Sequence, residues 1–101
     1  MQHEGAVLDT ERTRFLVLVR LAWELRGLGV AVSVEMAPTD EPWVRVPVAG
    51  SSMRVVARPR GDVWELVWGR GRNQWVDASE QYAARLVRQA ALRRVRRETN
   101  R

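Results

Sequence analysis

Cysteine, lysine and isoleucine are all missing from this chain of 101 residues. Without cysteine the chain forms no disulfide and offers no thiolate, and the single His3 cannot complete a zinc site of the usual Cys/His kind. We therefore expect no metal and no cofactor. Lysine and isoleucine have AT-rich codons, so a GC-rich genome is enough to explain why all 17 basic residues are arginine.

Long apolar runs are lacking as well. The longest, residues 15–19, is far shorter than the roughly 20 residues of a membrane span, and the N-terminus shows no secretory signal. A composition of 46% hydrophobic and 29% charged residues is typical of a globular protein. We therefore expect a cytoplasmic single domain over residues 9–97, with a flexible N-terminus at 1–8, a flexible basic C-terminus at 98–101 and no contact with membranes.

The net charge of +5 is distributed unevenly along the chain. Residues 85–101 carry seven arginines against one glutamate, which gives +6, and the other residues carry ten arginines against eleven acids, which gives −1. A cationic helix can neutralise phosphates, so a nucleic-acid-associated regulator is our alternative hypothesis. Cations at a helix C-terminus also interact favourably with its dipole, which leaves a purely structural interpretation open. The predicted phosphate contacts are Arg85, Arg88, Arg93, Arg94, Arg96 and Arg97.

The first part of the chain has apolar residues at the spacing of an α-helix. Asp9 is a suitable N-cap residue, and apolar residues then recur at three- and four-residue steps. Gly27 and Gly29 supply the C-terminal stop. Because Val19 and Trp23 widen the apolar stripe, we expect this helix to be buried over much of its circumference.

After the first helix, apolar residues recur at every second position. Alternating apolar residues predict four short antiparallel strands and a shorter fifth segment. A capping residue at position 77 with an acid three positions later then predicts the start of a second helix. This order predicts an α+β two-layer sandwich, in which an antiparallel sheet of three to four strands carries an N-terminal and a C-terminal helix on one face. The predicted strand segments are residues 30–36, 43–48, 53–58, 63–68 and 74–76.

Strand side chains alternate between the two faces of a sheet, so parity predicts which residues face the helices. The inward set is Val44, Val46, Met53, Val55, Trp64, Leu66 and Trp68. The outward set is Trp43, Arg45, Arg54, Val56, Arg58, Val63, Glu65 and Val67.

Tryptophan, valine and arginine interleave on the outward face, as they do in interface cores. A solvated sheet with cross-strand Arg–Glu pairs has a similar composition. We favour a non-catalytic protein-interaction module, acting as an adaptor, chaperone-like or regulatory accessory protein with a protein partner and as a homodimer. The predicted partner-binding residues are Trp43, Arg45, Arg54, Val56, Arg58 and Val67.

The segment at residues 69–72, Gly-Arg-Gly-Arg, superficially resembles a phosphate loop or an RG-type RNA segment. It lacks the Lys-Ser/Thr end of a P-loop, and a hairpin turn with two permissive glycines explains it equally well. Trp75 can stack on a base or pack against the neighbouring helix. No serine lies in a nucleophile motif such as G-x-S-x-G, so we expect no enzyme activity. A small-molecule site between helix and sheet is a third hypothesis.

Three features carry a resemblance to known proteins: the segment at residues 53–58, the W-E-L-V-W-G-R-G-R run at 64–72, and the Ala/Arg-rich closing helix. Together they resemble small actinobacterial proteins of the streptomycete type, for which no activity is established. The element order is also similar to the YbjN and type III secretion chaperone-like fold. That topological likeness implies a protein that binds protein segments and dimerises.

Overall fold

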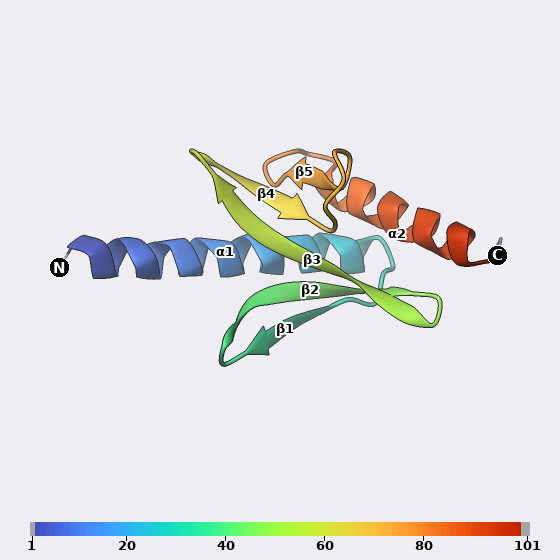
Figure 1. Ribbon diagram of the computed structural model, residues 1–101, viewed down its shortest axis with the longest axis horizontal. Coiled ribbons are helices and arrows are strands. Elements are labelled where there is room, and N and C mark those ends of the chain that lie inside the picture. The colour runs from blue at the N-terminus through green and yellow to red at the C-terminus, as the bar shows by residue number, and fades with distance from the viewer. Residues whose placement is uncertain (1, 100–101) are drawn as a thin grey trace.

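The computed structural model describes the backbone of residues 2–99 and the side chains of residues 9–96. It confirms the α+β class: an N-terminal and a C-terminal helix cover one face of an open antiparallel sheet (Figure 1). The sheet has five strands where sequence reasoning gave three to four, because the short segment around Val76 pairs as a strand. The elements are α1 (Gln2–Gly27), β1 (Ser33–Ala37), β2 (Asp40–Val48), β3 (Ser51–Arg60), β4 (Val63–Val67), β5 (Trp75–Asp77) and α2 (Ala83–Thr99).

The strands lie in the order of the chain, β1-β2-β3-β4-β5, and every neighbouring pair is antiparallel. β3 is the longest strand and joins two halves of the sheet. Its first half, up to Val55, pairs with β2, and its second half, from Val56, pairs with β4. Figure 1 shows β3 running diagonally across α1 between these halves, so the sheet is strongly twisted.

The predicted strand parity is confirmed. One buried cluster joins the inner face of the sheet to both helices, with α1 contributing Leu18, Leu21 and Leu25 and α2 contributing Val87. Trp64 is only half-buried and packs against the edge of this cluster. The other six inward residues are buried: Val44, Val46, Met53, Val55, Leu66 and Trp68.

The end of α1 follows the expected chemistry. The backbone N–H of Val30 donates to Leu25 O at 3.0 Å and that of Gly29 donates to Arg26 O at 3.0 Å, which is the Schellman pattern. Gly29 has a φ of 84°, the left-handed conformation that glycine adopts without steric cost.

Both predicted helix starts are wrong. α1 begins at Gln2, so Asp9 lies inside the helix and caps nothing. α2 begins at Ala83, six residues after Asp77. Asp77 instead closes a turn, since the N–H and Oγ of Ser79 both donate to its Oδ1, at 2.8 and 2.7 Å. These two hydrogen bonds, that from the hydroxyl first, lower the pKa of Asp77.

The predicted burial of α1 around much of its circumference is also wrong. The sheet and α2 cover only one side of the helix, and Trp23 is 76% exposed. Phe15, Leu16 and Val19 are exposed as well. A two-layer fold has only one sheet on which a helix can pack, so a second apolar stripe on the same helix is left without a partner.

Candidate functional site

The outer face of the sheet carries one row of side chains that crosses all five strands. Strand registers pair Glu35 with Trp43, Val56 with Val67, and Val67 with Trp75. The β2–β3 register, continued by one residue, places Trp43 beside Val56. The centre of the row is therefore apolar, and tryptophan stands at both ends of this apolar part.

Two arginines stand directly opposite each other beside this row. Arg45 and Arg54 are paired across β2 and β3, and their guanidinium carbons lie 4.7 and 4.2 Å from the centre of the Trp43 ring. Like charges in directly opposed positions destabilise a sheet. The shared tryptophan offsets part of this repulsion, because each cation gains from the ring quadrupole.

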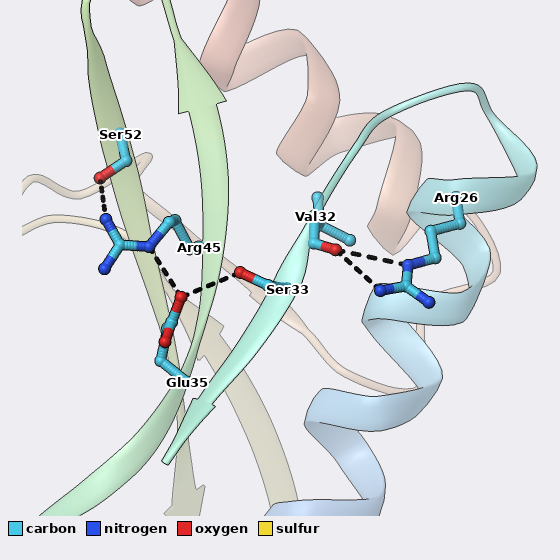
Figure 2. A network of polar contacts seen from close by, with 6 residues as sticks. All are labelled: Arg26, Val32, Ser33, Glu35, Arg45 and Ser52. Carbon is cyan, nitrogen blue, oxygen red and sulfur yellow. Dashed lines mark hydrogen bonds and ion pairs between the residues drawn. The ribbon is translucent and has the colours of Figure 1, made fainter. Parts of the chain in front are cut away.

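Arg45 also belongs to a polar network at the β1 edge (Figure 2). Its Nε donates to Glu35 Oε1 at 2.8 Å, its Nη1 donates to Ser52 Oγ at 3.4 Å, and Ser33 Oγ donates to the same carboxylate at 3.0 Å. The hydrogen bond from Arg45, and then that from Ser33, lowers the pKa of Glu35. Glu35 therefore stays ionised and neutralises Arg45, whereas Arg54 forms no ion pair among the described residues.

Further along the same face, Arg58 lies opposite Glu65. The Glu65 carboxylate instead forms an ion pair with Arg60, whose Nη1 lies 2.8 Å from Glu65 Oε1. Within the described part of the chain Arg58 has no ion pair of its own. Arg54 and Arg58 are thus two exposed, unneutralised cations on one strand beside the apolar row.

The apolar members of this predicted site are more covered than their sequence pattern suggested. Val56 is only 9% exposed, and Trp43 and Val67 are half-buried. The guanidinium groups of Arg45 and Arg54 lie over the Trp43 ring and cover part of it. The outer face is therefore a cationic surface over a largely covered apolar row, not an open hydrophobic patch.

The arginines predicted to bind phosphate do not share one face of α2. Arg85 lies near Tyr82 at the start of the helix, and Arg88 is exposed on a side away from the sheet. Arg94 has a structural contact, since its Nη2 donates to Trp68 O at 2.9 Å. Arg96 is exposed near the end of α2, and the side chain of Arg97 lies outside the described residues.

Arg93 and Arg94 do meet another part of the chain. They line one side of a hollow of about 410 Å³ between α2 and the turn that precedes β5. Arg72 and Trp75 line the other side, and Trp75 is 42% exposed. No acidic side chain lines this hollow, so the fold brings three arginines together near Trp75, whose ring centre also lies 5.5 Å from the guanidinium carbon of Arg60.

The Gln74 side chain packs so closely against Gly69 and Gly71 of that turn that it accounts for both glycines. The expectation that these glycines adopt left-handed conformations is wrong. Neither Gly69 nor Gly71 has a positive φ. The Gln74 side chain folds over both glycines and its Oε1 accepts a hydrogen bond of 2.8 Å from the Gly71 N–H. A Cβ on Gly69 would collide with this amide.

Sequence reasoning missed the most exposed apolar surface of the described residues, the outward stripe of α1. Leu16, Val19 and Trp23 follow one another at steps of three and four residues on the side opposite the buried Leu18 and Leu25. The signal was visible as apolar residues on both sides of one helix. Sequence reasoning placed Val19 and Trp23 in the buried stripe and did not single out Leu16.

The hypothesis of a small-molecule site between helix and sheet stays a prediction. The hollow between α1 and β4 measures about 260 Å³, and a second hollow of about 710 Å³ lies between α1 and the β1–β2 turn. Ordinary ligand pockets measure roughly 300–1,000 Å³. Among the described residues no cluster of histidine, cysteine or acidic side chains could hold a metal ion. Nor is any described helix both long and apolar enough to span a membrane.

Comparisons with known proteins found no relative of this chain. No family model, no curated protein and no solved structure matches this chain.

Proposed function

We propose that this chain is a non-catalytic protein-interaction module whose outer sheet face binds an acidic segment of a partner protein. The observation that carries the proposal is the Arg45–Arg54 pair, opposed across two strands and shared by the Trp43 ring. A cross-strand pair of like charges costs stability in the isolated domain. Glu35 already pairs with Arg45, so a partner carboxylate bound beside Arg54 would neutralise the other member of the pair.

A protein segment suits this face better than a nucleic acid does. Both guanidinium groups already lie against Trp43, so its ring is occupied and offers little surface for stacking on a base. Val56 and Val67 have no π-face at all. A partner side chain that is apolar, flanked by acids, would contact the row and reach Arg54 and Arg58.

The test is a selection of peptides from a displayed random library on the immobilised chain. We expect the selected peptides to combine Asp or Glu with large apolar residues. Arg54→Glu should weaken their binding at least tenfold, because it removes one cation of the pair. The same variant should fold well, since a glutamate opposite Arg45 replaces repulsion with attraction.

Arg88→Glu is the matched control. It makes the same charge reversal at an exposed position of α2, outside the sheet face, and should leave peptide binding unchanged apart from weak long-range screening. Equal losses in the two variants would show that the peptides respond only to net charge. Selected peptides without acids would contradict the proposal.

A second candidate function is supported by the basic hollow at the start of β5. Arg72 and Arg93 line it without an acid, which suits the phosphates of a single-stranded nucleic acid. Anisotropy of labelled single-stranded and duplex oligonucleotides at increasing salt tests this candidate. Binding should weaken with a slope of about −0.7 per phosphate contacted on single strands.

The matched pair for this candidate is Arg93→Glu and Arg88→Glu, two reversals on the same helix of which only the first borders the hollow. Selective loss in Arg93→Glu supports the candidate. Equal loss in both variants, or no binding at physiological salt, excludes the hollow as a nucleic-acid site.

A further inference from the structure

The outward stripe of α1 is longer than its three apolar residues. Charged residues extend it at both ends with the same alternating steps of three and four, the repeat of a coiled-coil seam. All six positions lie on one side of the helix, and the described core positions lie on the other. In order, the positions are Asp9, Arg12, Leu16, Val19, Trp23 and Arg26.

These six positions are complementary to the same six positions of a second, antiparallel copy of α1. If two copies of α1 pack antiparallel about a point between residues 17 and 18, Leu16 of each copy meets Val19 of the other. In an antiparallel coiled coil the two kinds of seam position face each other, and this arrangement satisfies that requirement at every layer. The centre of the seam is then apolar in both copies.

The residue pairs on either side of the apolar centre of the seam are also complementary. Arg12 of one copy lies over Trp23 of the other, a cation–π pair. Asp9 of one copy meets Arg26 of the other, an ion pair. Arg26 already donates from Nε and Nη2 to Val32 O, at 3.3 and 3.1 Å, which holds its guanidinium in place beside the helix end (Figure 2). A parallel pairing would instead bring Asp9 to Asp9 and Arg12 to Arg12.

The shape of the molecule supports the same arrangement. α1 extends beyond the sheet at its N-terminal end, as Figure 1 shows, so this part of the helix is not covered by the sheet. At the other end of α1, a hollow of about 620 Å³ lies beside Trp23 and is bordered by Arg26 and Arg85. In the antiparallel arrangement Asp9 of one copy lies beside this hollow of the other, which is lined by Arg26, Arg85 and Glu24.

We propose that α1 is a self-docking surface and that two copies of this chain associate through an antiparallel pair of α1 helices. The seam is on the opposite side of the molecule from the outer sheet face, so the dimer leaves the proposed partner-binding surface open on both copies. This inference does not depend on the identity of that partner.

The first test is sedimentation equilibrium over a wide concentration range with a matched pair of variants. Leu16→Glu and Leu92→Glu make the same change at positions 55% and 50% exposed in helices, but only Leu16 lies on the seam. We expect the unchanged chain to dimerise, Leu16→Glu to raise the dissociation constant by about 30-fold or more, and Leu92→Glu to have little effect. A monomer at every concentration, or equal effects of the two variants, would overturn the proposal.

The second test fixes the orientation and uses the absence of natural cysteine. Asp9→Cys and Gly27→Cys each place one thiol on the outward side of α1, and a Cβ at Gly27 meets no other atom. The two positions are about 27 Å apart along one helix, whereas a disulfide requires Cα atoms within roughly 7 Å. Oxidation should therefore link a mixture of the two variants and neither variant alone. Linked dimers of a single variant, or none in the mixture, would contradict the antiparallel seam.

Discussion

At the scale of single residues, the five tryptophans show that one residue type can hold several structural positions. Trp68 is buried in the core, Trp43 lies under two guanidinium groups, and Trp23 is exposed to solvent. Their local sequences share one feature: each has an arginine or a glutamate within three residues. The environment of each ring is decided by the element opposite it.

Trp68→Ala should therefore destabilise the domain by about 3–5 kcal/mol, since it removes a large buried aromatic and leaves a cavity. Trp23→Ala makes the same change at an exposed position and should change the stability by at most about 0.5 kcal/mol. Urea unfolding at low protein concentration, where the chain is monomeric, measures both values. Similar losses in the two variants would mean that Trp23 is buried in the monomer.

At the scale of elements, the W-G-R-G-R turn shows why a glycine pattern does not reveal its own cause. From the sequence we expected Gly69 and Gly71 to adopt the left-handed backbone conformations that glycine permits. The fold instead places the Gln74 side chain over Gly69 and Gly71, where any Cβ would be in the way. A side chain three to five residues further on thus explains both glycines.

Gly69→Ala should cost about 1 kcal/mol, because Gln74 must swing away and give up its hydrogen bond from the Gly71 N–H. In a Gln74→Ala background the same substitution should be neutral or slightly stabilising, since the φ of Gly69 is not positive and alanine restricts the unfolded chain. A double-mutant cycle by urea unfolding gives the coupling between the two positions. Additive effects would show that the two residues do not interact.

At the scale of the whole molecule, two chemically different surfaces lie on opposite sides of one thin sandwich. The sheet face is cationic over a covered apolar row, and the outward side of α1 is apolar with a charge at each end. The charge arithmetic of the sequence pointed to α2 instead, yet Arg94 of that helix is held by Trp68 O and Arg93 lies at the hollow that Arg72 also lines. Placement in the fold, not the number of arginines, determines which of them act together.

The two surfaces should behave independently. Leu16→Glu is expected to prevent dimerisation and leave the affinity for the selected acidic peptides unchanged within about twofold, because sites that share no residues are additive. Arg54→Glu is expected to do the reverse. Calorimetric titration of peptide into each variant, beside sedimentation of the same samples, measures both properties. Loss of peptide binding in Leu16→Glu would show that the sheet face works only in the dimer.

The sequence by itself determined the elements and the two faces of the sheet. Alternation with period two is a property of neighbouring residues, so it located the strands and placed Val44, Met53 and Leu66 inside and Trp43 outside. Helix starts were less predictable, since Asp9 and Asp77 are both good capping residues by type, yet Asp9 lies inside α1 and Asp77 closes a turn instead.

Only the tertiary structure decided which apolar stripe of α1 is covered and which arginines meet. A helix with apolar residues on two sides can pack on a sheet through either of them, and local periodicity does not distinguish the two. Arg54 faces Arg45 and Arg93 faces Arg72 because of strand register and helix placement, which depend on contacts between residues far apart in the chain. The candidate surfaces of this protein are therefore products of its fold, built from residues whose types the sequence had already supplied.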